Sequence, residues 1–300
     1  MTENLQIYTE FFGLGARPFT LLPDPDFIYW SDAHQRAYTM LEYGLITHAP
    51  ITVITGEIGA GKTTLLRELL KKCPDDLTVG LVSNAAADRG EMLHWVMMAL
   101  DQSVDPELSY VQTFQRFQNF LIEEYAAGRR TVLIFDEAQN LTVESLEELR
   151  MYSNINADQD ELLQLVLVGQ PQLVDLLNDP RLVQFAQRVV AEFHLPNMTD
   201  AAVEAYIRHR MAVAGAKRQV FTAAACREIF EASNGTPRLV NQVCDFALVY
   251  AYSLGRKTVD DAIVKRVLKD RRRFGVLRRQ PPQDGRELPP NAVSIVSDRR

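Results

Sequence analysis

The sequence predicts an α/β fold: a five-stranded parallel sheet flanked by helices, followed by a smaller all-helical domain. Three observations predict it. Short apolar runs alternate with helical patterns up to Pro196, a glycine-rich loop follows the first of these runs, and only helical patterns come after Pro196. Because strands alternating with helices form sheets covered on both faces, we expect the apolar runs to be fully buried.

The N-terminal residues are rich in aromatic side chains and prolines. Prolines between Phe12 and Ile28 exclude a long helix there. Ser31 can cap a helix that ends near Gly44. The strands are expected at 51–55, 77–82, 131–135, 162–168 and 191–195. The helices between them are expected at 63–72, 91–100, 113–125, 143–153, 171–177 and 180–189, and four more at 200–214, 223–233, 237–254 and 259–269.

Composition narrows the class of protein. The chain has 300 residues, 47% of them hydrophobic and 24% charged, which is ordinary for a soluble protein with an ample core. Its net charge of −7 argues against a large sequence-independent surface for DNA. The chain has no leader-like start, and no apolar run approaches the roughly 18 residues that span a bilayer. Its three cysteines show no disulfide or metal spacing, so we expect a cytoplasmic protein.

The glycine-rich loop is a P-loop. Residues 56–63 read G-E-I-G-A-G-K-T, between a predicted strand and a predicted helix, which is the context that the motif requires. Backbone N–H groups of such a loop cradle phosphate oxygens, with help from the helix N-terminus. Lys62 would reach the β- and γ-phosphates, and Thr63 would bind Mg²⁺. The predicted ATP-binding residues are Gly56, Glu57, Ile58, Gly59, Ala60, Gly61, Lys62, Thr63 and Thr64.

Two acids follow the strand at 131–135. We predict that Asp136 holds the metal and that Glu137 orients the water that attacks the γ-phosphate. The alternative is an acid pair that caps the next helix. Gln139 and Asn140 either start that helix or sense the state of the nucleotide. The letters Asp-Glu-Ala-Gln also resemble the acid box of helicases, but a single predicted motor domain does not fit most of those.

Three further side chains are candidates for the site. Gln170 follows the strand at 162–168 and could touch the γ-phosphate or the water, or else cap a helix beside Pro171. Arg238 comes just after Pro237, where a cation opposes the helix dipole, so we expect it to face the nucleotide. Arg188 precedes the last strand, on the same helix face as Arg181, and could enter a neighbouring subunit's site as an arginine finger. A surface ion pair is the alternative for both Arg188 and Arg238.

Together these residues resemble those of an AAA+ ATPase. The N-terminal residues resemble the start of the general secretion pathway protein A type, which includes pilus-biogenesis and exosortase-associated ATPases. The motifs that carry this second resemblance are Phe12-Gly-Leu, Arg17-Pro-Phe19, Pro23-Asp-Pro25, Phe27, Tyr29, His34 and Tyr43-Gly44. The resemblance implies an oligomeric ATPase that uses ATP and Mg²⁺ to assemble a bacterial cell-envelope secretion or export complex.

The resemblance also divides the chain. We expect an extension at 1–48 that packs on the nucleotide site, an AAA+ core at 49–197, a helical lid at 198–270 and a disordered tail at 271–300. Phe19, Phe27 and Tyr29 would pack against the sheet or wall the adenine, and His34 is expected to be structural.

Members of the secretion type continue into a transmembrane helix and a peptidoglycan-binding domain, which this sequence does not include, so we expect a shorter relative. The basic segment at 265–279 has two interpretations. Either it docks on anionic lipid or a partner, which would make any membrane contact peripheral, or it is a solvated helix end and tail. The rival interpretation is a DNA-linked AAA+ ATPase that regulates transposition or replication initiation. Initiator-type proteins usually add a winged-helix DNA reader after the lid, for which too few residues remain here, whereas transposition regulators lack that domain.

Overall fold

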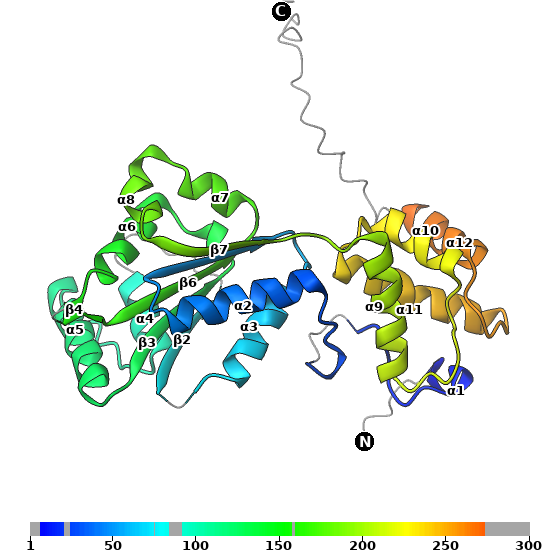
Figure 1. The fold of residues 1–300 in the computed structure, drawn as a ribbon, viewed down its shortest axis with the longest axis horizontal. Coiled ribbons are helices and arrows are strands. Elements are labelled where there is room, and N and C mark those ends of the chain that lie inside the picture. The colour runs from blue at the N-terminus through cyan, green and yellow to red at the C-terminus, as the bar shows by residue number, and fades with distance from the viewer. Residues whose placement is uncertain (1–6, 21–24, 75, 84–91, 158–159, 274–300) are drawn as a thin grey trace, which may run out of the picture.

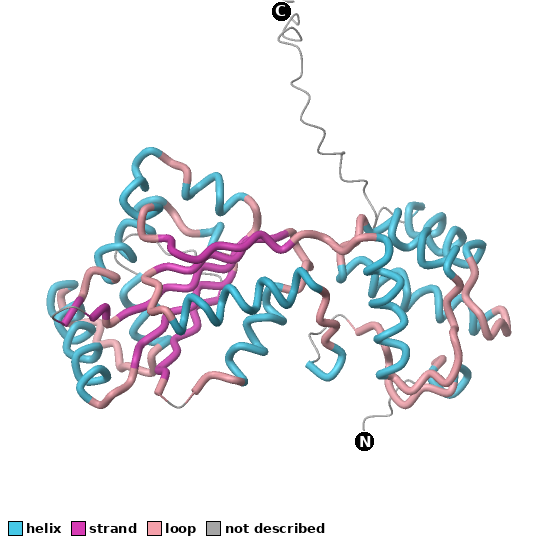
Figure 2. The backbone as a smooth tube through the Cα atoms, in the orientation of Figure 1, coloured by secondary structure: helices cyan, strands magenta, loops and turns pink. Residues whose placement is uncertain are grey.

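The computed structural model describes residues 7–20, 25–74, 76–83, 92–157 and 160–273. An α/β domain and a helical domain lie side by side and are joined by an extended segment after β7 (Figure 1). All strands of the large sheet belong to the first domain (Figure 2). Residues 271–273 are helical, and the rest of the predicted tail lies outside the described residues. No described helix has both the length and the apolar character needed to cross a membrane.

The five predicted strands form one parallel sheet in the order β2-β3-β6-β1-β7, which confirms the predicted fold class. Asp136 at the end of β3 pairs with Val168 on β6, and Thr55 on β1 pairs with Gly169. The register therefore brings the carboxyl ends of three strands to one edge, where open α/β sheets bind their ligands. The strands are β1 (Ile51–Gly56), β2 (Leu77–Ser83), β3 (Arg130–Asp136), β6 (Leu163–Gly169) and β7 (Val189–Leu195).

Successive residues of the strands point to opposite faces of the sheet, and an apolar layer lies on each face. Ile134 and Val166 pack on one face with Leu41 and Leu65, which come from the two helices next to the P-loop. The opposite layer holds the other alternate strand residues together with side chains of the helices on that face. The first face is covered by α2 (Asp32–Ile46) and α3 (Lys62–Lys71), and the second by α4 (Met92–Ala99), α5 (Tyr110–Ala126) and α6 (Val143–Tyr152).

Several elements differ from the expectation. The helix predicted at 180–189 is replaced by a 3₁₀ turn, η3 (Pro180–Leu182), and a single turn, α8 (Val183–Ala186). Arg181 and Arg188 therefore do not share one helix face, because Pro180 and the short turns change the direction of the chain. Five short elements were not expected, because such short runs carry no periodic pattern. They are α1 (Thr9–Phe12), η1 (Pro25–Phe27), η2 (Ala138–Asn140) and the hairpin of β4 (Asn156–Ala157) and β5 (Asp160–Glu161). The turn after β6 is α7 (Gln172–Leu177), as expected.

The helical domain, residues 198–273, is called the lid below. It contains the four predicted helices, α9 (Asp200–Val213), α10 (Ala223–Ser233), α11 (Pro237–Ser253) and α12 (Asp261–Arg273). Phe12, Phe19 and Phe27 are buried in the lid core, and Tyr29 packs against it. Of the two expectations for Phe19, Phe27 and Tyr29, packing against the sheet is therefore wrong, while Phe27 and Tyr29 line the cavity beside the P-loop. Further along the chain, α2 packs against β1 and β7, so the described N-terminal residues connect both domains.

Candidate functional site

The P-loop lies between β1 and α3, with Gly59 and Gly61 in the left-handed region at φ +79° and +105°. Lys62, the first residue of α3, is buried. Its Nζ donates hydrogen bonds to the backbone carbonyls of Gly56 (2.7 Å) and Glu57 (3.1 Å). Burial lowers the pKa of Lys62, and the nearby carboxylates of Glu137 and Asp136 oppose this. The lysine charge is thus held within the loop that would receive phosphate.

The two predicted metal-binding residues lie together. Thr63 Oγ1 donates to Asp136 Oδ2 at 3.0 Å, and the N–H of Glu137 donates to Asp136 Oδ1 at 3.0 Å. Burial raises the pKa of Asp136, and the bond from Thr63 partly offsets this. A hydroxyl and a carboxylate are the oxygen donors that Mg²⁺ takes when phosphates and water complete its shell. The donor set of Thr63 and Asp136 therefore fits Mg²⁺.

Glu137 is held by two side-chain amides. Its backbone is left-handed, with φ +57°, and its Oε2 accepts from Gln139 Nε2 at 2.7 Å and from Gln170 Nε2 at 3.2 Å. Burial acts to raise the pKa of Glu137, but the two amides and Lys62 outweigh it, so the pKa lies below its usual value. Gln170 is thus next to the acid pair, as the sequence suggested. Gln139 belongs to the same group, although the sequence left its role open.

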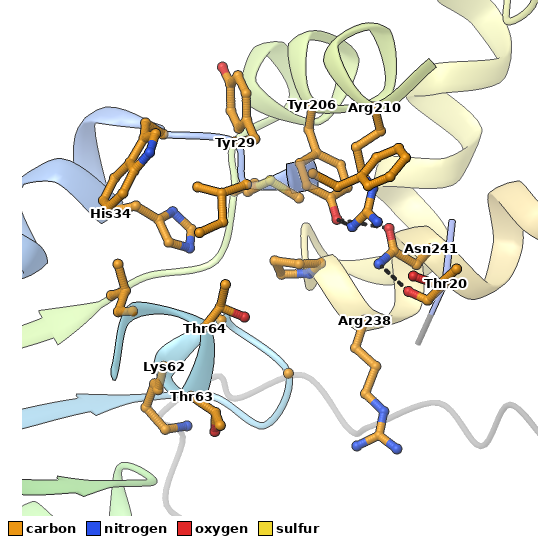
Figure 3. A pocket seen from close by; sticks show the side chains of 18 of the residues that line it. Thr20, Tyr29, His34, Lys62, Thr63, Thr64, Tyr206, Arg210, Arg238 and Asn241 are labelled. Atoms are coloured by element: carbon orange, nitrogen blue, oxygen red, sulfur yellow. Dashed lines mark hydrogen bonds between the residues drawn. The ribbon is translucent and has the colours of Figure 1, made fainter. Parts of the chain in front are cut away.

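A cavity of about 340 Å³ adjoins these groups. All three parts of the chain line it (Figure 3), since Tyr29 and His34 come from the N-terminal residues, Thr64 from the P-loop helix, and Tyr206 from the lid. Six predicted P-loop residues line it, namely Ile58, Gly59, Gly61, Lys62, Thr63 and Thr64. Gly56, Glu57 and Ala60 belong to the loop but do not line the cavity. Its size is that of a small-molecule site.

His34 supports the loop from the N-terminal side. Its Nε2 lies 3.1 Å from the carbonyl oxygen of Ala60, and its Nδ1 lies 2.7 Å from Ser31 Oγ. The carbonyl can only accept, so Nε2 carries the proton and Nδ1 accepts from the serine hydroxyl. Burial lowers the pKa of His34. The neutral ring therefore braces the P-loop, which is a structural role within the site.

The lid reaches the P-loop at Arg238. The N–H of Arg238 donates to the carbonyl of Gly59 at 3.3 Å, and the side chain is exposed at the cavity wall. Gly235, at φ +69°, lies directly against the backbone of Met198, so no side chain could be accommodated there. Thr236 occupies the N-cap position of α11, but its side chain makes no capping hydrogen bond.

Arg188 is not brought to the site of its own chain. It precedes β7, whose first residue Val189 pairs with Ile51, so it lies at the sheet edge opposite the P-loop. Its Nη2 donates to Ser153 O and to Glu161 Oε1, each at 2.9 Å, and its Nη1 donates to Asn154. Arg181 is exposed and pairs separately with Asp179 at 2.8 Å and with Glu144 at 3.6 Å.

Comparison with known proteins agrees with this geometry. A family model described as an AAA domain matches residues 46–177. General secretion pathway protein A from Aeromonas hydrophila is 37% identical over 249 residues, which are 83% of this chain and 46% of that protein. The chain therefore spans less than half the length of this relative.

Solved structures show the same fold at low sequence identity. CDC6P from Pyrobaculum aerophilum matches with a TM-score of 0.63 and 18% identity, over 83% of this chain and 71% of that chain. The Aeropyrum pernix ORC2 protein, in ADPNP-ADP complexes, matches with a TM-score of 0.59 and 15% identity, over 79% and 66% of the two chains.

Proposed function

Because this chain belongs to the AAA+ ATPases of the general secretion pathway protein A type, we propose that it hydrolyses ATP with Mg²⁺ between its core and its lid. One observation carries the proposal. The charged side chains of Lys62, Asp136 and Glu137 meet at one sheet edge, beside a cavity that the lid completes. Phosphoryl transfer depends mainly on charges and dipoles in fixed positions, which this arrangement provides.

Each side chain has a defined task in this proposal. Lys62 would leave the carbonyls of its own loop and neutralise charge on the β- and γ-phosphates. Thr63 and Asp136 would hold Mg²⁺, which supplies positive charge to the phosphate oxygens. Glu137 would orient the attacking water, while Gln170, which donates to the same carboxylate, would contact that water or the γ-phosphate.

The lid and the N-terminal residues would bind the remainder of the nucleotide. Tyr29, Ile58 and Tyr206 offer apolar surface for a base, and Arg238 offers a cation next to the loop. The exposed guanidinium of Arg238 makes no ion pair with the described residues, which leaves it available to phosphate. Nucleotide binding would therefore pull the lid and the core together.

We further propose that the active form is a homo-oligomer in which Arg188 acts on the neighbouring subunit. Its place at the edge opposite the P-loop suits a residue that completes another subunit's site. Within one chain Arg188 forms an ion pair with Glu161. To act on the neighbouring subunit, Arg188 would either break this ion pair or keep it and reach the neighbour with a free edge of its guanidinium. Arginine fingers stabilise the charge that develops on the transferred phosphoryl group.

The proposed cellular role comes from the relative. General secretion pathway protein A is named for a secretion pathway, and we propose that this chain likewise drives the assembly or remodelling of an envelope complex. Because such work consumes ATP, the site would face the cytoplasm, with any membrane contact being peripheral. Proteins of the export machinery are the partners that this role implies.

An ATPase assay with and without duplex DNA tests the proposal. We expect Mg²⁺-dependent release of phosphate from ATP that is lost in Lys62→Ala, with little response to DNA. No Mg²⁺-dependent hydrolysis under any oligomeric condition would refute the enzymatic part. Strong stimulation by DNA would instead favour a DNA-linked ATPase that regulates transposition or replication initiation.

A further inference from the structure

The side-chain amide of Gln139 joins two strand ends. Its Oε1 accepts the backbone N–H of Gln170 at 2.9 Å, and its Nε2 donates to Glu137 Oε2 at 2.7 Å. The orientation of the amide follows from chemistry, because a backbone N–H can only donate and a carboxylate can only accept. Among side chains of this length, only glutamine offers an acceptor and a donor in this arrangement. The two bonds connect the end of β6 to the acid that follows β3.

Gly169 gives independent support for this contact. A Cβ placed on Gly169 would lie 3.0 Å from Gln139 Oε1 and 3.2 Å from its backbone nitrogen. It would also lie 2.9 Å from Leu173 Cδ2. Because Gly169 has no side chain, the Gln139 amide can pack against the end of β6. Any side chain at residue 169 would have to move Gln139 or Leu173.

We propose that Gln139 is a positioning residue that sets Glu137 for hydrolysis and links it to Gln170, the residue placed to contact the γ-phosphate. This inference rests on the proposed ATPase function. A shift of Gln170 towards bound phosphate moves its backbone N–H, and the amide of Gln139 carries that movement to the carboxylate. The state of the γ-phosphate would then control the group that orients the water.

A residue that only filled space would leave the turnover of bound ATP unchanged. The split between ATP affinity and kcat is therefore the readout that separates positioning from packing.

The test compares Gln139→Met with the wild-type chain. Methionine has a similar length and lacks both hydrogen bonds, so we expect ATP affinity within about threefold of wild type and a kcat at least about tenfold lower. Gln115→Met is the matched control, because Gln115 is an exposed helical glutamine whose side chain, among the described residues, donates a hydrogen bond only to its helix neighbour Asn119. It should leave both quantities unchanged.

A second variant perturbs the contact from the other side. Gly169→Ala keeps Gln139 but displaces its amide, so kcat should fall in this variant as well. An unchanged kcat in Gln139→Met would overturn the positioning role, even if Gly169→Ala is impaired. Equal turnover of the wild type and Glu137→Gln would instead refute the proposed catalytic role of Glu137 itself, and the role of Gln139 with it.

Discussion

Gly59 of the P-loop and Arg238 of the lid are in direct contact. A Cβ on Gly59 would lie 2.6 Å from the Cβ of Arg238, and the two residues share a backbone hydrogen bond of 3.3 Å. The lid therefore rests on the phosphate-binding loop itself. Gly59 is required here for two reasons, since its φ is +79° and there is no room for a side chain.

Gly59→Ala should weaken nucleotide binding by separating the lid from the loop. We expect the Kd for ATP to rise at least about tenfold, a change of about 1.4 kcal/mol. A fluorescent nucleotide titration measures it. Gly128→Ala is a close control, because Gly128 has φ +75° with no other atom within 4 Å of an added Cβ. It carries a similar backbone strain without the lid contact. Equal loss of affinity in both variants would contradict the role of the contact.

Glu137→Gln should abolish most hydrolysis while ATP still binds. A general base contributes about 10²- to 10⁴-fold, so kcat should fall within that range. The amide keeps the size of the side chain but cannot accept a proton from water, and it also meets the donors of Gln139 and Gln170 with a mixed donor and acceptor group. Single-turnover kinetics with a parallel binding titration separate the two effects. Loss of affinity equal to the loss of kcat would argue against the assignment.

Arg188→Ala should lose hydrolysis in a way that a second subunit can restore. Mixing Arg188→Ala protomers with Glu137→Gln protomers should recover activity, because some interfaces then combine an intact Glu137 with an intact Arg188. Turnover measured across mixing ratios gives the result. The same experiment with Arg181→Ala decides between the two arginines. If Arg188→Ala alone kept full activity, and Arg181→Ala recovered activity when mixed with Glu137→Gln protomers, Arg181 would be the arginine that acts on the neighbouring subunit.

Phe19→Ala should destabilise the lid although residue 19 precedes the sheet by many residues. Phe19 is 1% exposed and packs edge-to-face on Phe221, with ring centroids 5.8 Å apart. Removing a buried phenylalanine costs about 3–5 kcal/mol. Denaturant unfolding should show this loss, whereas Val111→Ala, at a residue that is 74% exposed, should change stability little. If Phe19→Ala left the free energy of unfolding unchanged, the N-terminal residues would not be part of the lid core in solution.

The sequence identified the sheet and the phosphate loop because both depend on local patterns. Apolar runs fix strands wherever a sheet is buried on both faces, and the P-loop motif is contiguous from Gly56 to Thr63. The helix expected at 180–189 was wrong because its apolar spacing continues across two separate short turns, η3 and α8. Gln139 was left undecided because its partners, Glu137 and Gln170, lie on different strand ends.

The sequence by itself determined the fold class, the P-loop and the acid pair, since each needs only neighbours along the chain. Only the tertiary structure decided that Phe19 and Phe27 belong to the lid rather than to the sheet. It also decided that Arg188 lies at the opposite sheet edge in a pair with Glu161, and that Gln139 joins Glu137 to Gln170. The physical reason is that these contacts join residues from separate elements, and packing and strand register, rather than local spacing, bring them within hydrogen-bonding distance.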